Sequence, residues 1–216
     1  MIDLHTHSLF SDGELLPSEL VYRAKVKGYE IVALTDHADF SNFDFVIPRI
    51  KNITNDLSNF YNIVVIPGVE ITYVPPKLIS KAVKISRKLG AKIVIVHGET
   101  VAETVPKLTN HYAILAEVDI LAHPGYLSIE DAKLAAKKNV FLEITTRKGH
   151  NTTNKHVARI AKLSGAKLVF NTDTHGLDDL MNKDIINKTL KKSNLTQKDF
   201  FDMQNNARQL ISKLGG

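Results

Sequence analysis

The sequence predicts an α/β fold in which strands and helices alternate around a barrel. Seven short apolar runs rich in β-branched residues recur along the chain, with helical patterns between them. Most runs are apolar throughout, as expected for parallel strands that are covered on both faces. Potential metal ligands follow every run, and a barrel brings all such strand ends to one face, which favours it over an open sheet. The runs are residues 2–4, 31–34, 63–66, 93–96, 118–121, 140–144 and 168–170.

The segments between these runs carry signals for the ends of helices. Pro17 suits a first helical turn and Gly28 a C-terminal stop. We expect the second helix to begin near Pro48, because a proline inside a longer helix would break it. The remaining signals are Pro75 and Pro76 before a helix that ends at Gly90, and two capping boxes, Ser128 with Asp131 and Thr196 with Asp199.

Length and composition indicate one globular domain that spans residues 1–216. Hydrophobic residues make up 44% and charged residues 24% of the chain, which is the balance of a soluble protein. The first residues do not resemble a secretory signal, and no apolar stretch approaches the roughly 20 residues that span a bilayer. We therefore expect a cytoplasmic protein with no membrane partner, and the sequence predicts no oligomeric state.

Cysteine is absent, and this limits the chemistry of any metal site. Disulfides and thiolate ligands are excluded, so a metal must bind nitrogen and oxygen ligands. The formal net charge of +5 comes from lysines scattered along the predicted helices, which indicates mainly a solubilising surface. The same charge would attract phosphorylated or nucleic-acid substrates, and composition does not separate the two readings.

The residues that follow the runs predict a metal cluster. Six of the nine histidines lie at these positions. A single histidine at a strand end is commonly structural, but so many imidazoles and carboxylates without metal would bring like-charged acids together at a severe desolvation and repulsion cost. Divalent cations remove that cost. The residues are His5, His7, Asp12, Asp36, His37, Glu70, His97, Glu99, His123, Glu143, Asp173 and His175.

Some polar residues are expected to have other roles. Asp36 and Glu99 either orient ligating histidines as outer carboxylates or cap local backbone. His111, His150 and His156 match no motif, so we expect them to lie outside the site.

The order of these residues resembles the PHP family, the polymerase and histidinol phosphatase metal-dependent phosphoesterases. The resemblance spans nearly the whole chain and implies a distorted seven-stranded barrel of the TIM type, in agreement with the seven runs. The matching motifs are His5-Thr6-His7-Ser8 with Ser11-Asp12-Gly13, Thr35-Asp36-His37, Glu70 in Pro67-Gly68-Val69-Glu70, His97, His123, and Asp173-Thr174-His175.

The resemblance also implies two or three divalent metal ions, which would be zinc, manganese or iron. The first would be held by His5, His7, Glu70 and Asp173, and the second would share Glu70 and add His97 and His123. The third would be held by Asp12, His37 and His175, although some family members have histidine where this chain has Asp12. With Glu70 as a bridging ligand, the first two ions would lie about 3.5–4 Å apart, and a hydroxide between them would attack phosphorus.

Two basic residues after the sixth run are the expected substrate contacts. Arg147 and Lys148 could reach a substrate phosphate, and an arginine can hold two oxygens at once. The alternative for each is a solvated loop charge. Glu70, Asp173 and Arg147 are the expected catalytic residues.

The resemblance implies hydrolysis of a phosphate ester, most directly a small phosphomonoester such as histidinol phosphate. A phosphodiesterase or exonuclease acting on oligonucleotides is the first alternative, and the basic net charge favours it. The second alternative is a non-catalytic barrel that serves as a scaffold or an RNA-binding subunit, similar to degenerate relatives in ribonuclease P. The complete set of ligands argues against this last reading.

Overall fold

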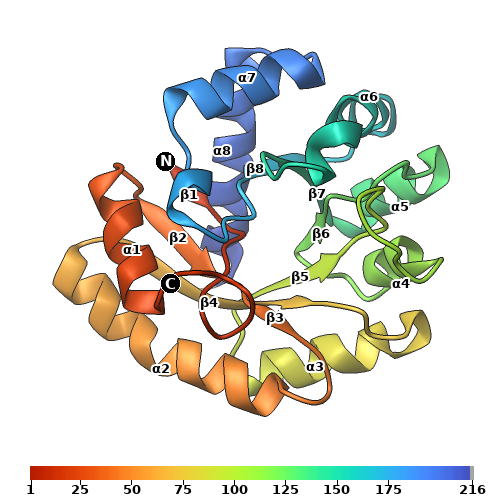
Figure 1. Cartoon of the computed structure of the whole chain (residues 1–216). Helices are drawn as coiled ribbons and strands as arrows, with labels where there is room; N and C mark the ends of the chain where they lie inside the picture. The colour runs from red at the N-terminus through yellow and green to blue at the C-terminus, as the bar shows by residue number, and fades with distance from the viewer. Residues whose placement is uncertain (215–216) are drawn as a thin grey trace.

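Seven parallel strands form a nearly closed barrel with helices around it in the computed structural model, which describes residues 1–214 (Figure 1). The strands pair in the order β1-β2-β4-β5-β6-β7-β8. The predicted seven-stranded TIM-like α/β barrel is therefore confirmed. The strands are β1 (Ile2–Asp3), β2 (Ile31–Leu34), β4 (Val64–Ile71), β5 (Ile93–His97), β6 (Ile120–Ala122), β7 (Phe141–Thr145) and β8 (Leu168–Asn171).

The third strand is longer than its apolar run predicted. Residues 64–67 of β4 pair with β2, and residues 68–71 pair with β5 on the other side. The strand therefore continues through Pro67 and Gly68 to Glu70. A two-residue strand, β3 (His37–Ala38), also pairs with the end of β4 and sets His37 opposite Glu70. The sequence of β3, histidine followed by alanine, gives no apolar run, so β3 was not predicted.

Helices connect successive strands and cover the outside of the barrel (Figure 1). Ser128 and Thr196 begin two of them, since each side chain accepts a hydrogen bond from the backbone N–H three residues later. The predicted capping box is complete at Thr196 and Asp199, whereas Ser128 forms only the N-cap bond. Within residues 1–214, none of the helices is long and apolar enough to cross a membrane. The helices are α1 (Pro17–Val26), α2 (Phe43–Tyr61), α3 (Ile79–Leu89), α4 (Thr109–Leu115), α5 (Ile129–Lys138), α6 (Asn154–Ser164), α7 (Lys183–Ser193) and α8 (Gln197–Lys213).

The expected start of the second helix near Pro48 is wrong. Helix α2 begins at Phe43 and contains Pro48 in its second turn. A proline there removes one backbone hydrogen bond and disturbs the preceding turn. The Arg49 guanidinium donates to the Phe45 carbonyl oxygen at 3.0 Å, and Ile47 is fully buried beside the proline. These contacts hold the turn in place, so the helix continues through the proline.

Alternating residues along each strand face either the helices or the inside of the barrel. The interior cluster contains Ile93 and Ile95 of β5, and Ala207 and Leu210 of α8 pack against the same cluster. His97 is the next residue with the inward parity of Ile93 and Ile95. The lower part of the barrel is thus filled with apolar side chains, and polar side chains of the same parity occupy the upper part.

The first and last strands meet at an irregular junction. Within residues 1–214 they share no regular ladder, but Thr6 and Thr174 form an isolated parallel bridge, and the His7 N–H donates to the Thr174 carbonyl at 2.8 Å. At the other end of β1, the buried amide of Gln204 in α8 accepts from the Ile2 N–H at 2.7 Å and donates to the Ile2 carbonyl at 2.9 Å. Helix α8 therefore satisfies the open edge of β1.

Candidate metal centre

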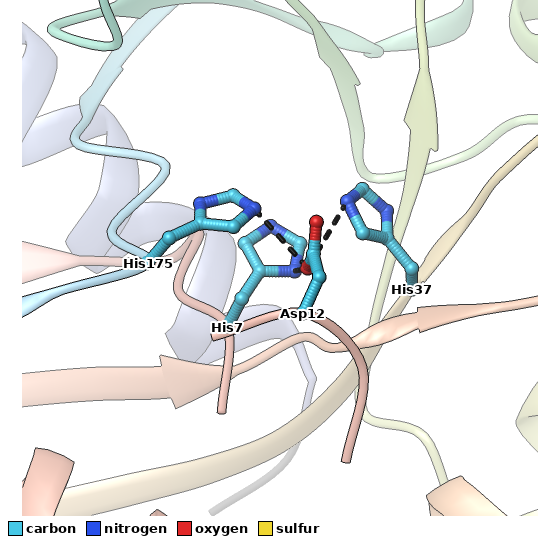
Figure 2. A group of neighbouring side chains, drawn as sticks. All are labelled: His7, Asp12, His37 and His175. Atoms are coloured by element: carbon cyan, nitrogen blue, oxygen red, sulfur yellow. Dashed lines mark ion pairs between the residues drawn. The ribbon is translucent and has the colours of Figure 1, made fainter. Parts of the chain in front are cut away.

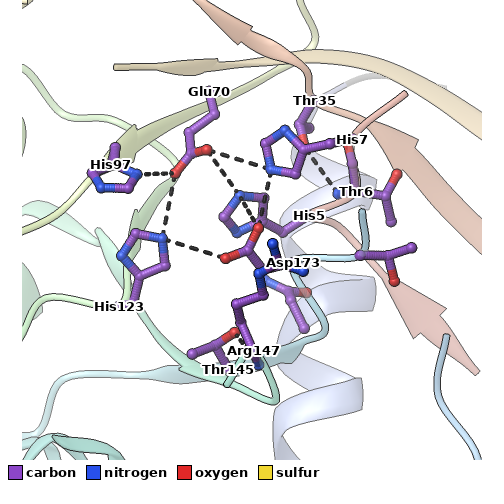
Figure 3. Close-up of polar contacts among 12 residues, drawn as sticks. His5, Thr6, His7, Thr35, Glu70, His97, His123, Thr145, Arg147 and Asp173 are labelled. Carbon is purple, nitrogen blue, oxygen red and sulfur yellow. Dashed lines mark hydrogen bonds and ion pairs between the residues drawn. The ribbon is translucent and has the colours of Figure 1, made fainter. Parts of the chain in front are cut away.

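The nine predicted ligands converge at the mouth of the barrel (Figures 2 and 3). Four overlapping groups of their nitrogen and oxygen atoms are compact enough to hold a metal ion. Each of these residues ends a strand or lies in the loop that follows one, which is why residues so distant in sequence meet. The groups are His5 with His7 and Glu70, His5 with His123 and Asp173, His37 with Glu70 and His97, and His7 with Asp12, His37 and His175.

Glu70 lies at the centre of the cluster (Figure 3). Its Oε2 is 3.2 Å from His5 Nε2 and 3.5 Å from His7 Nε2. Its Oε1 is 3.4 Å from His97 Nδ1 and 3.6 Å from His123 Nε2. Its Oε2 also lies 2.8 Å from His37 Nδ1. The two carboxylate oxygens therefore face different groups of imidazoles, which is the arrangement that a carboxylate shared by two cations requires.

Asp173 faces Glu70 across the same space. Its Oδ1 lies 3.1 Å from His7 Nε2, and its Oδ2 lies 3.7 Å from His123 Nε2. The backbone of Asp173 has a φ of 56°, and that of His123 has a φ of 28°. Such left-handed conformations cost roughly 1–3 kcal/mol in non-glycine residues and cluster at functional sites. The loops after β6 and β8 thus hold both side chains toward the centre in sparsely populated conformations.

A second cluster lies at the outer edge (Figure 2). Asp12 Oδ1 is 3.2 Å from His175 Nε2, 3.7 Å from His37 Nε2 and 4.0 Å from His7 Nδ1. The side chain of Asp12 is 57% exposed, so this cluster is open to solvent. His7 presents its second nitrogen here, which the sequence did not predict.

Buried nitrogen and oxygen atoms without hydrogen-bond partners indicate whether the cluster is suited to bind metal ions. Within residues 1–214, twelve buried side-chain nitrogen or oxygen atoms lack a hydrogen-bond partner, and ten belong to this cluster. Each such atom costs about 1–3 kcal/mol, so ten would cost as much as the roughly 5–15 kcal/mol stability of a whole domain, or more. Divalent cations would use these lone pairs, and the donor set fits them. The atoms are both nitrogens of His7, His97 and His123, Nε2 of His5, both oxygens of Glu70 and Oδ1 of Asp173.

Burial and neighbouring charges prepare several of these side chains for coordination. Burial lowers the pKa of His7 to about 3 and holds the pKa of His123 well below its ordinary value, so both imidazoles are neutral at pH 7. Burial also disfavours charge on His5, but the carboxylates of Glu70, Glu143 and Asp173 together outweigh it and raise the His5 pKa. Burial would raise the pKa of Glu70 and Asp173, but the surrounding histidines, His5 foremost, together outweigh it and hold both pKa values well below their ordinary range. Metal binding at His5 must therefore displace a proton.

Contacts outside the cluster orient its histidines. Glu143 is fully buried, and its Oε1 lies 2.8 Å from His5 Nδ1, which leaves His5 Nε2 facing Glu70. Asn171 donates to the same oxygen at 2.9 Å, and the backbone N–H of His123 donates to Oε2 at 3.1 Å. A carboxylate behind a ligating histidine fixes its tautomer and increases its basicity. The sequence placed Glu143 at a strand end but did not predict this role.

Asp36 and Glu99 belong to the local backbone rather than to the ligating histidines. Asp36 accepts hydrogen bonds from the Ser8 N–H at 2.7 Å and from the hydroxyls of Ser8 and Ser11. Glu99 accepts from the N–H of Asn110 at 2.9 Å. Of the two roles expected for this pair, the structure therefore supports local capping.

The two predicted substrate contacts differ in their surroundings. Arg147 follows β7, and its Nη1 donates to Asp179 Oδ2 at 3.0 Å. The same Asp179 oxygen accepts from the backbone N–H groups of His175 and Gly176, both at 3.0 Å. Arg147 is therefore joined to the loop that carries His175, whereas Lys148 is exposed.

His150 lies beside the cluster, contrary to expectation. It is 8% exposed, its ring centroid is 4.3 Å from that of His123, and its Nε2 is 3.3 Å from Glu103 Oε1. The only sequence signal was its position three residues after Arg147, in the loop that follows β7. His111 pairs with Asp131 at 2.7 Å away from the metal groups, as expected for a residue outside the site.

The comparison with protein families identifies the chain. The family model described as the PHP domain matches residues 3–182. The chain belongs to the PHP family. The resemblance of its motifs to this family of metal-dependent phosphoesterases is therefore confirmed, and the cluster is able to bind metal as that class of hydrolase requires.

Relatives within and around the PHP family differ in their named activities. "Uncharacterized protein MJ1295" of Methanocaldococcus jannaschii is 48% identical and covers 91% of both chains. "Probable phosphatase" of Acetivibrio thermocellus is 26% identical over 81% of this chain and 79% of its own. "DNA polymerase/3'-5' exonuclease PolX" of Bacillus subtilis is 27% identical over 82% of this chain, which spans only 35% of that protein.

A solved structure gives independent support for the fold. A chain in the cryo-EM structure of archaeal ribonuclease P with mature tRNA has a TM-score of 0.74 and 17% identity, and the match covers 99% of this chain and 91% of that chain. At this identity the likeness concerns the barrel alone.

Proposed function

We propose that the protein hydrolyses small phosphate monoesters with the help of divalent cations at the mouth of the barrel, and that histidinol phosphate is the first substrate to test. The ten unpartnered buried atoms carry this proposal, because they have no structural use without cations. Membership of the PHP family and the relative named as a phosphatase support it.

The distances favour two cations that share Glu70. One would be held by His5, His7, Glu70 and Asp173, and the other by Glu70 with His97 and His123, in line with the distances from each carboxylate oxygen. Nitrogen and oxygen donors of this kind suit zinc, manganese or iron.

The outer cluster would hold a third, weaker ion. Burial disfavours charge on His37, but the carboxylates around it, Glu70 foremost, together outweigh burial and raise the His37 pKa to about 9. A proton therefore competes with a metal ion at His37 near neutral pH. Asp12 is also largely exposed, so this group is less enclosed than the central one.

The side chains around the cations have distinct roles in this proposal. Bound divalent cations would lower the pKa of water and neutralise charge on the phosphate oxygens. Glu143 keeps His5 oriented toward Glu70 through its contact with Nδ1. Arg147 would exchange its pairing with Asp179 for the substrate phosphate, which it can hold through two nitrogens. Water supplies the new P–O bond, the ester P–O bond breaks, and the leaving oxygen takes a proton.

Phosphodiester cleavage is the second candidate. The PolX relative and the net charge of +5 favour it. A non-catalytic scaffold is less well supported, because it would keep ten buried atoms without partners for no purpose.

One experiment separates the candidates. Metal content of the purified protein is measured together with hydrolysis of histidinol phosphate, 4-nitrophenyl phosphate and a short single-stranded oligonucleotide. We expect more than one equivalent of transition metal and turnover of the monoesters. Cleavage of the oligonucleotide alone would replace the proposal by the diesterase, and a metal-free protein with full activity would refute the role of the cluster.

A further inference from the structure

Three loops meet on one side of the mouth at the carboxylate of Glu103. Its Oε2 lies 3.3 Å from the Tyr73 hydroxyl and 3.4 Å from His97 Nε2, and its Oε1 lies 3.3 Å from His150 Nε2. The other nitrogen of His97 faces Glu70 at 3.4 Å. Glu103 is therefore separated from the central carboxylate by one imidazole ring, although it belongs to none of the candidate metal-binding groups in residues 1–214.

The aromatic ring of Tyr73 lies beside Glu103 and His97. Its backbone φ is 54°, a left-handed conformation that costs a tyrosine roughly 1–3 kcal/mol and persists only when its surroundings impose it. Its ring lies 6.0 Å from that of His97 with an interplanar angle of 23°, and the residue is still 54% exposed. The loop after β4 thus fixes a tyrosine over the edge of the metal centre instead of burying it.

The mouth carries basic side chains as well as the Glu103 carboxylate. Arg147, with the neighbouring Lys148, follows β7 and suits a phosphate. Glu103 is 41% exposed and lies beside the Tyr73 ring, so a carboxylate and an aromatic face are presented together. That combination binds ammonium and imidazolium groups through an ion pair and a cation–π contact, and it disfavours an anionic group.

We propose that Tyr73 and Glu103 determine specificity by selecting phosphate monoesters whose leaving group carries a positive charge. The inference rests on the proposed phosphatase function. With the phosphate at the metal centre, a leaving group directed toward the loops after β4 and β5 meets both side chains. A protonated amine or an imidazolium a few bonds from the ester oxygen is within their reach, because only the His97 ring separates Glu103 from the centre.

Two esters of equal size test the proposal. Phosphoethanolamine ends in an ammonium group, and propyl phosphate ends in a methyl group in the same position. The quantity measured is the ratio of their kcat/KM values with metal-loaded wild type, Glu103→Gln and Tyr73→Leu. The matched controls are Glu130→Gln and Tyr22→Leu, which change an exposed glutamate on α5 and an exposed tyrosine on α1. A loss of turnover common to both esters cancels in the ratio.

We expect the wild type to prefer phosphoethanolamine, and Glu103→Gln to lower the ratio about fivefold, which corresponds to the roughly 1 kcal/mol of a partly solvated ion pair. Tyr73→Leu should lower it about threefold, in keeping with an exposed cation–π contact. The control variants should keep the wild-type ratio.

Different results would refute the specificity proposal and the phosphatase function. Equal kcat/KM values for the two esters in the wild type, or a ratio that Glu103→Gln leaves unchanged, would overturn the specificity proposal while the phosphatase function stands. A metal-loaded wild type that hydrolyses neither of these esters nor 4-nitrophenyl phosphate would refute the phosphatase function, and the specificity proposal would fall with it.

Discussion

Replacing Glu143 by glutamine tests whether an outer carboxylate prepares the metal centre. In the wild type, Oε1 lies 2.8 Å from His5 Nδ1 and accepts from Asn171 at 2.9 Å, while Oε2 accepts from the His123 N–H at 3.1 Å. Glutamine has the same shape but only one accepting oxygen. Whichever way its amide turns, an NH₂ group faces at least one buried N–H donor.

The expected losses of stability and metal affinity follow from the donor that glutamine leaves without an acceptor. One buried donor without a partner costs about 1–3 kcal/mol in unfolding free energy. Loss of the carboxylate behind His5 also removes the group that orients Nε2 toward Glu70, and such losses typically lower metal affinity about 10–100-fold. Glu143→Gln should therefore weaken both the metal-free fold and metal binding.

Two assays measure these effects separately. Urea unfolding in the presence of a chelator gives the stability of the metal-free protein, and calorimetric titration with Mn²⁺ or Zn²⁺ gives affinity and stoichiometry. Glu117→Gln serves as the control, because Glu117 is an exposed glutamate that pairs with Lys138 on the surface. A folded Glu143→Gln variant that binds metal within twofold of wild type would show that Glu143 does not prepare His5.

Three further predictions follow from the geometry. Asp173→Ala should abolish hydrolysis and reduce metal content while the far-ultraviolet circular dichroism stays native. The control Asp178→Ala should keep both the activity and the metal content of the wild type, because Asp178 is exposed. Burial raises the pKa of Asp3 from 3.8 to about 7, so the contribution of Asp3 to the stability of the metal-free protein is full below pH 3.8 and is lost as the pH rises to 7. The thermal midpoint of the metal-free protein should therefore fall less between pH 4 and 7 in Asp3→Asn than in wild type. Equal falls in the two proteins would contradict this prediction. Gln204→Leu should lower the urea-unfolding free energy by about 2–4 kcal/mol, because the N–H and C=O of Ile2 lose their partners; an unchanged midpoint would show that water replaces the amide.

Sequence patterns predicted the barrel because its strands are buried on both faces. A continuous apolar run such as residues 93–96 marks such a strand directly. The same reasoning missed β3, which has two residues, and ended the third run before Glu70, because Pro67 and Gly68 interrupt the apolar pattern. Pro48 was assigned to the wrong place because its cost is offset by burial of Ile47, which is a tertiary effect, and by the Arg49 side chain, which donates to the Phe45 carbonyl within the helix.

The candidate ligands were predictable because they lie at or after the ends of strands. A strand end is recognisable in sequence, and the barrel brings strand ends together, so the convergence of Glu70 and Asp173 followed from topology. Glu103 and His150 lie within loops whose course is set by tertiary contacts, and neither has a fixed offset from a strand end. Such residues could be found only from coordinates.

Cations at the centre would link the two ends of the sheet. His5 and His7 follow the first strand, Asp173 follows the last, and the backbones of the two segments are joined by a short bridge. Candidate ligands from both sides would couple ion release to local opening, so that each favours the other. Amide hydrogen exchange at His7 and Asp173, whose N–H groups cross this junction, would then report metal occupancy without any substrate.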